Sequence, residues 1–171
     1  MKISLRAKAV VGIICMSLII SATAIALSYR TYANTMDEHY QKMCLDLAES
    51  AIAMLDSEKM KHYAETMEKD EYYDEQRDIL CRLVEANDSA LYIYVAVSPG
   101  GGSFEEGDPL YDIMDTDPMV KPPEEEVAYL DVEAGDDVVF ISQTEEFGWL
   151  CTALVWMYDE TGDTYAFMNV D

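Results

Sequence analysis

The longest apolar stretch of the chain lies at its beginning. Residues 9–28 contain no charged side chain and consist mainly of Val, Ile, Leu, Met and Ala. At a helical rise of 1.5 Å per residue, about 20 such residues reach about 30 Å, which matches the hydrocarbon core of a bilayer. The pattern predicts one transmembrane helix over residues 9–28.

A helical pattern continues directly after this stretch. Between residues 31 and 55 apolar side chains recur at alternating three- and four-residue steps, from Met36 to Met54. This spacing gives a helix one broad apolar face. Because no Gly or Pro interrupts residues 17–55, we expect the membrane helix to continue into a long stalk helix.

The rest of the chain changes from helical to strand periodicity. Asp56 or Ser57 can cap a short second helix, and a third is expected at about Glu71–Glu85. A proline- and glutamate-rich stretch over residues 115–126 is expected to be an irregular connector. Strands are expected at Leu91–Val97, Leu110–Met114, Val138–Ser142, Gly148–Tyr158 and Thr164–Val170. This order predicts an α+β fold, an antiparallel sheet of about five strands with a long helix across one face.

Charge is distributed very unevenly about the apolar stretch. Lys2, Arg6 and Lys8 precede it, which by the positive-inside rule places residues 1–8 in the cytoplasm and residues 31–171 outside the cell membrane. All 34 acidic residues lie beyond Arg30, with seven Lys or Arg among them. So strong a negative charge excludes nucleic acid as a partner.

A cleavable signal peptide is the alternative to an anchor. Both Ala22-Thr23-Ala24 and Ala24-Ile25-Ala26 offer the small residues that a signal peptidase requires. The apolar run continues past both sites to Leu27 and then into the stalk pattern. An uncleaved, single-pass anchor is therefore favoured.

The four cysteines match no metal or disulfide framework. Cys15 lies in the membrane stretch, whereas Cys44, Cys81 and Cys151 lie in the exported part. Buried thiols are the default interpretation, and a Cys44–Cys81 bridge between two helices is the alternative.

No set of side chains at catalytic spacing indicates an enzyme. His39 and His62 are the only histidines, and neither has a partner at catalytic spacing. Residues 159–163 resemble a calcium loop only loosely and fit a solvated hairpin turn better. We expect no catalytic activity, no cofactor and no metal site.

The end of the chain has a recognisable order of motifs: residues 147–154 with Gly and Trp in second and third place, the Tyr158-Asp159 pair, the Gly162 turn and the ending at residues 166–171. This order is similar to the closing hairpin of the extracytoplasmic Cache domains of bacteria, which are PAS-like sensor modules. The segments 91–95 and 115–118 are similar to the first hairpin and exit of that family. The chain departs from the family pattern in having Phe147 where the family has tyrosine, and in lacking a proline after Trp156.

The resemblance implies a domain that binds a small molecule between the sheet and the connector after the second strand. The ligand-facing candidates would be Tyr92, Tyr94, Tyr111, Asp115, Asp117, Trp149, Thr152 and Asp171. The arginine motif of amino-acid-binding members is not visible, so amino acids are not favoured as the ligand. Each aromatic candidate can instead serve only as packing.

Of the eight candidates, Trp149 is the one that we favour most as a ligand-site residue. On a strand it shares a face with Cys151, Ala153 and Val155, whose small side chains leave space beside a large ring. We expect the Trp149 ring to border the ligand cavity, and the alternative is that it fills the core.

Two functions from different classes remain. The first is the ligand sensor of a transmembrane receptor, which passes a displacement through the membrane helix to an output domain absent from this chain. A receptor of this kind is expected to act as a homodimer. The second is an anchored or secreted binding or adhesion protein with no signalling output. Later apolar runs are too short to span a membrane, so the receptor interpretation carries the expectation that the reading frame is partial.

Overall fold

The computed structural model describes residues 5–144 and 147–171, and the chain divides into two compact units, residues 1–39 and 40–171. Helix α1, Leu5–Met54, contributes to both. In the first unit its apolar side chains, from Val10 to Leu27, are exposed. By length and composition, α1 is a helix that could cross a membrane.

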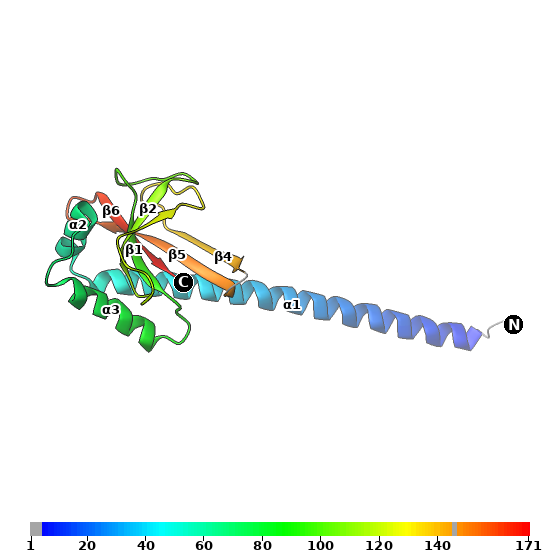
Figure 1. The fold of residues 1–171 in the computed structure, drawn as a ribbon. Helices are drawn as coiled ribbons and strands as arrows, with labels where there is room; N and C mark the ends of the chain where they lie inside the picture. The colour runs from blue at the N-terminus through cyan, green and yellow to red at the C-terminus, as the bar shows by residue number, and fades with distance from the viewer. Residues whose placement is uncertain (1–4, 145–146) are drawn as a thin grey trace. The chain divides into compact units, whose positions relative to one another are not determined.

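The second unit has the predicted α+β fold. Figure 1 shows an antiparallel sheet with helices beside it, in the strand order β3-β2-β1-β6-β5-β4. The elements are residues 40–54 of α1, then α2 (Ser57–Thr66), α3 (Tyr73–Ala86), β1 (Ile93–Val97), β2 (Pro109–Asp115), β3 (Glu124–Val127), β4 (Val138–Thr144), β5 (Gly148–Tyr158) and β6 (Thr164–Val170).

The sheet has six strands instead of about five. The additional strand, β3, lies within the stretch that was expected to be irregular, and it pairs with β2 from Pro109↔Val127 to Asp112↔Glu124. All four β3 residues are exposed. A charged edge strand of this kind carries no apolar alternation, so the sequence offered no signal for it.

Local interactions fix the two short helices. Of the two candidate caps, Asp56 and Ser57, it is Asp56 that caps α2, since its carboxylate accepts a hydrogen bond of 3.2 Å from the Lys59 backbone N–H. The Gln76 side chain of α3 accepts a bond of 2.8 Å from the Asp56 N–H, which ties the start of α2 to α3. The turn after β5 is held by the Asp159 carboxylate, which accepts bonds from Thr161 and Asp163 and pairs with Lys61 of α2 at 2.8 Å.

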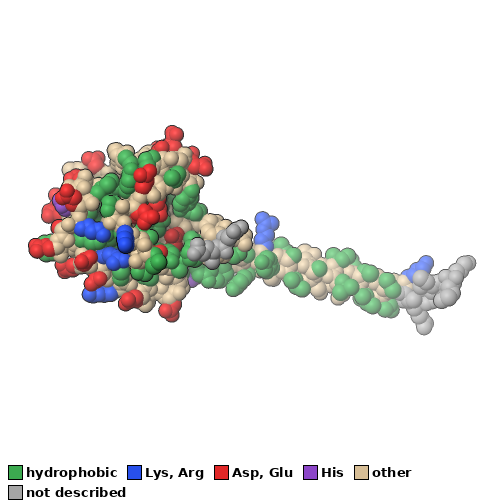
Figure 2. Space-filling model, in the orientation of Figure 1, with side chains coloured by type: hydrophobic (Ala, Val, Ile, Leu, Met, Phe, Trp, Pro, Cys, Tyr) green, Lys and Arg blue, Asp and Glu red, His purple; other side chains and the backbone are tan. Residues whose placement is uncertain are grey.

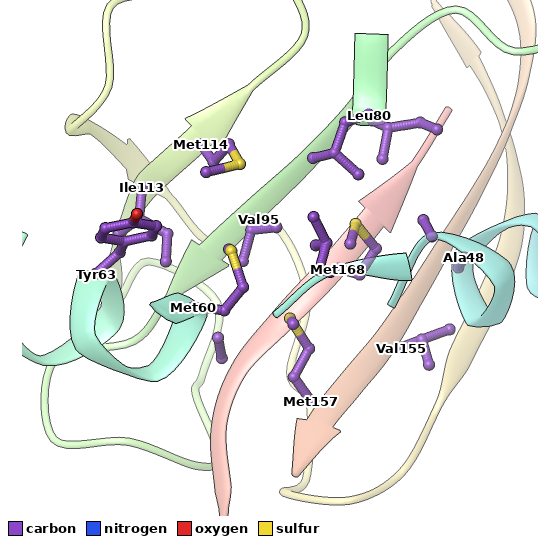
Figure 3. Packing of buried hydrophobic residues seen from close by; sticks show 14 of the residues in the cluster. Ala48, Met60, Tyr63, Leu80, Val95, Ile113, Met114, Val155, Met157 and Met168 are labelled. Carbon is purple, nitrogen blue, oxygen red and sulfur yellow. The ribbon is translucent and has the colours of Figure 1, made fainter. Parts of the chain in front are cut away.

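The helices cover one face of the sheet, here called the helix face. Figure 3 shows side chains of all three helices meeting those of the strands in a methionine-rich core. The labelled members are Ala48, Met60, Tyr63, Leu80, Val95, Ile113, Met114, Val155, Met157 and Met168. Buried apolar area of this extent is the main stabilising contribution of the domain.

The opposite face, here called the outer face, has a smaller core. Phe104 and Val132 pair through an isolated bridge, and Phe104 packs against Trp156 and Phe167 on the strands. This segment covers only part of the outer face.

None of the four cysteines forms a disulfide, so the Cys44–Cys81 bridge is not present. The Cys44 thiol instead lies at the sheet, where it donates to the Cys151 backbone carbonyl at 3.4 Å.

Candidate ligand cavity

A cavity of about 620 Å³ lies on the outer face of the sheet. Its volume falls within the usual range for small-molecule sites. The lining residues are Tyr94, Glu126, Val127, Tyr129, Phe140, Ser142, Thr144, Leu150, Thr152 and Asp171.

Strand alternation explains why these residues share a face. In the β4–β5 ladder Phe140 is opposite Thr152 and Ser142 is opposite Leu150. Side chains of directly paired residues project from the same side of a sheet, and every second residue along a strand does so too. The odd-numbered neighbours Cys151 and Val155 therefore belong to the helix face.

Curling of the sheet brings its two edges together over the cavity. Tyr129 follows β3 at one edge, and Phe140 lies on β4 at the other. Their ring centroids are 5.7 Å apart with an interplanar angle of 68°. The two rings form an edge-to-face corner of the kind that aromatic pairs favour.

A short hydrogen bond joins two lining residues from different strands. The Thr152 hydroxyl donates to the Asp171 carboxylate at 2.5 Å. Asp171 is also fixed through its backbone, because its N–H donates to the Tyr92 carbonyl at 3.0 Å. Burial raises the pKa of the Asp171 carboxyl, and the bond from Thr152 opposes that shift.

A second carboxyl group, that of Asp112, interacts with the lining residue Glu126. Asp112 is only 1% exposed, and within the described part of the chain its Oδ1 has no hydrogen-bond partner. Burial, together with the neighbouring carboxylates of Glu126 and Asp115, raises the Asp112 pKa to about 8. A carboxyl group of this kind holds a proton at neutral pH and can share it with Glu126.

Three of the eight predicted ligand-facing residues line the cavity: Tyr94, Thr152 and Asp171. Burial raises the pKa of the Tyr94 phenol well above its ordinary value.

Three other candidates lie elsewhere. Asp115, 5% exposed, is opposite Tyr94 in the β1–β2 ladder, and burial raises its pKa to about 6. Its carboxylate accepts a bond of 2.6 Å from the Asp117 N–H, so both residues serve the turn after β2. The Tyr111 hydroxyl lies 3.5 Å from Glu125, which is not a lining residue.

The two remaining aromatic candidates are peripheral. Tyr92 packs edge-to-face on Phe147 at 6.1 Å. Trp149 is 74% exposed and does not line the cavity, so the expectation of a covered environment for its ring, either in the cavity or in the core, is wrong. The physical reason is parity, because residue 149 and residue 152 project from opposite faces of β5.

Sequence reasoning missed much of the cavity wall. Phe140 could have been found by pairing the strands at 138–142 and 148–158 in register, which places it opposite Thr152. Glu126 and Tyr129 depend on β3 and on the curl of the sheet, for which no local pattern exists.

Comparison with known proteins identifies no relative, since no family model, curated protein or solved structure gives a significant match to this chain.

Proposed function

We propose that this chain is the extracytoplasmic ligand-sensing part of a membrane-anchored signal-transduction receptor, with a sensor domain of the Cache type. Two features support the proposal. The segments 147–154 and 166–171, which resemble that family, lie largely within β5 and β6, and these two strands pair with each other. A cavity of small-molecule size lies on the sheet that these strands help to build.

One observation carries the proposal, namely that the cavity and α1 contact adjacent residues of β5. Thr152 lines the cavity on the outer face. Cys151, the preceding residue, accepts the bond from the Cys44 thiol of α1 on the helix face. Because the two residues are consecutive in β5, a ligand that shifts the backbone at Thr152 would also shift the Cys151 carbonyl and with it the contact to α1.

Helix α1 connects the sheet domain to the apolar stretch, so a displacement of residues 40–54 could be transmitted along the helix. Ala48, Ala51 and Leu55 pack into the helix-face core, and the same helix includes the apolar stretch that could cross a membrane. In this proposal α1 is an uncleaved single-pass anchor with residues 1–8 in the cytoplasm and residues 31–171 outside.

Hydrogen–deuterium exchange on the full chain in lipid nanodiscs tests the proposal. A library of small metabolites is first screened for compounds that raise the unfolding temperature. A sensor predicts that a binding compound changes amide exchange both in β5 and in residues 40–54 of α1. Residues 73–86 of α3, none of which lines the cavity, serve as the internal control.

The alternative, an anchored or secreted binding or adhesion protein, predicts protection at the cavity and unchanged exchange in α1. A library in which no compound stabilises the chain would contradict ligand sensing altogether.

A further inference from the structure

We infer that the cavity binds a small organic cation carrying a protonated amine, an inference that rests on the proposed ligand-sensing function. Its walls combine negative charge, aromatic faces and hydroxyl groups. These are the groups that recognise ammonium ions.

Among the described residues, no cationic side chain lines the cavity or forms an ion pair with a lining carboxylate. Glu126 and Asp171 both line the space, and the ten lining residues include no Lys, Arg or His. The ion pairs between described residues involve Asp56, Glu65 and Asp159, all of them away from the lining. The Asp171 carboxylate is partly withdrawn from water without a counterion, which is unfavourable, so a bound cation would relieve that cost. Glu126 is exposed and contributes its negative charge.

The carboxyl groups near the cavity also repel one another. Asp171 and Glu124 act on Glu126, and Glu126 acts on the buried Asp112. Although Glu126 is an exposed residue, partial desolvation of its carboxyl group and the charges of these neighbours raise its pKa. An incoming positive charge would be attracted by all of these groups together. Figure 2 shows that acidic side chains are also spread over the visible surface of the domain, which would attract cations toward it.

The aromatic corner distinguishes an organic cation from a metal ion. Tyr129 and Phe140 meet edge-to-face, and Tyr94 is a third ring in the lining. Ring faces attract ammonium groups and also pack against carbon chains. Calcium and magnesium require six or more oxygen ligands, and the described residues contain no cluster of three acidic, His or Cys side chains suited to a metal.

The hydroxyl groups define the ligand more narrowly. Ser142, Thr144 and Thr152 add acceptors beside the two carboxylates, and a protonated primary amine has three N–H donors to offer them. A free α-amino acid would bring a carboxylate for which the lining offers no cationic partner. A simple amine or diamine therefore fits the cavity better than an amino acid.

The test uses the full chain in nanodiscs of zwitterionic lipid. The organic probes all have a four-carbon chain, and a calcium salt tests for metal binding. n-Butylamine and 1,4-diaminobutane are compared with butyrate, butanol and calcium chloride, by unfolding temperature and by calorimetric titration. We expect the amines to bind and the other probes to have no effect. Binding of butyrate or calcium in place of the amines would overturn the inference and leave ligand sensing intact.

Charge-removing variants locate the site. Glu126→Gln and Asp171→Asn should each weaken amine binding about ten- to a hundredfold, as expected for loss of one charge-assisted hydrogen bond. Glu125→Gln, one residue away on β3 and outside the lining, is the matched control and should bind normally. Phe140→Leu keeps an apolar wall while removing a ring face, and should weaken binding without unfolding the domain. Equal amine affinity in all four variants would also overturn the inference.

The amine assignment and the ligand-sensing proposal fail in different ways. If no amine binds but another compound from the metabolite library does, only the amine assignment is wrong. If amines bind as expected and exchange in α1 stays unchanged, the ligand class stands and the signalling proposal fails.

Discussion

The Thr152 hydroxyl of β5 donates a 2.5 Å hydrogen bond to the carboxylate of Asp171, the residue that follows β6. Both residues line the cavity, so this bond fixes the position of a carboxylate at which the proposed cation would bind. It also links two neighbouring strands on the outer face.

Thr152→Val keeps the shape of the side chain and removes the donor. We expect the free energy of unfolding to fall by about 1–3 kcal/mol, because a largely buried carboxylate loses a hydrogen bond. Denaturant unfolding of the full chain, followed by tryptophan fluorescence, measures the change. Thr164→Val, at the start of β6 and away from the cavity, is the control. Equal stability of the two variants would show that the Thr152–Asp171 bond contributes nothing.

Asp112 should make the domain less stable as the pH rises. Its folded-state pKa of about 8 exceeds the ordinary value of 3.8, so between these values the folded chain holds a proton that the unfolded chain releases. The stabilisation is complete below about pH 4 and is lost as the pH rises through about 8. One such proton contributes a slope of at most about 1.4 kcal/mol per pH unit.

The Asp112→Asn variant tests this slope. Asp115 and Glu126 act on the same group, and their own pKa values are also raised in the folded chain, so the slope should become shallower without vanishing. Stability measured from pH 5 to pH 8.5 provides the comparison, with the exposed Asp88→Asn as the control. A slope in Asp112→Asn as steep as in the parent would mean that Asp112 is ionised in the folded protein.

Much of the fold could be predicted from the sequence, and much of the cavity could not. The strand over residues 148–158 was recognisable from its length and β-rich composition, and it has the predicted bounds. Which of its faces the helices would cover was not recognisable, because Leu154 and Val155 are both apolar and both buried. Thr152 and Trp149 were consequently assigned to one site although they project from opposite faces.

The membrane topology is tested with reporters. A phosphatase that is active only outside the cytoplasm, fused after Asp171, should be active, and a cytoplasm-only fluorescent reporter at the same place should be silent. The expectation follows from the basic residues at 2, 6 and 8. The opposite pattern would disprove export of the acidic domain.

Retention of the anchor requires a separate measurement. Intact mass of the membrane fraction after a high-salt wash should show the complete N-terminal segment. A soluble product beginning near Ile25 would establish the signal-peptide alternative instead.

The Cys44 thiol should be unusually slow to react. It is buried against the Cys151 carbonyl, and burial raises its pKa to about 12. Because the thiolate is the nucleophile, alkylation of Cys44 by a maleimide at pH 7.5 should be at least a hundredfold slower in the folded chain than in denaturant, roughly as its thiolate fraction requires. Mass spectrometry follows each site, with the half-buried Cys81 as the internal comparison. Fast alkylation of Cys44 in the folded chain would show that α1 separates from β5 frequently.

The two tryptophans of the chain lie in opposite environments on one strand, and this contrast tests the cavity assignment. Trp149 is 74% exposed, whereas Trp156 is 2% exposed and its indole N–H donates to the Asp136 carbonyl at 3.0 Å. Trp149→Phe should therefore change stability by less than about 0.5 kcal/mol. Trp156→Phe loses a buried hydrogen bond and part of the outer-face core, so it should cost about 1–3 kcal/mol.

Acrylamide quenching separates the two residues spectroscopically, because it reaches exposed indoles and is insensitive to the charge of the domain. The readily quenched emission should disappear in Trp149→Phe and remain in Trp156→Phe. Any compound that stabilises the parent chain should stabilise Trp149→Phe equally, since the Trp149 ring lies outside the cavity lining. A loss of that stabilisation in Trp149→Phe would mean that the ligand binds on the helix face near residue 149, and the cavity on the outer face would not be the ligand site.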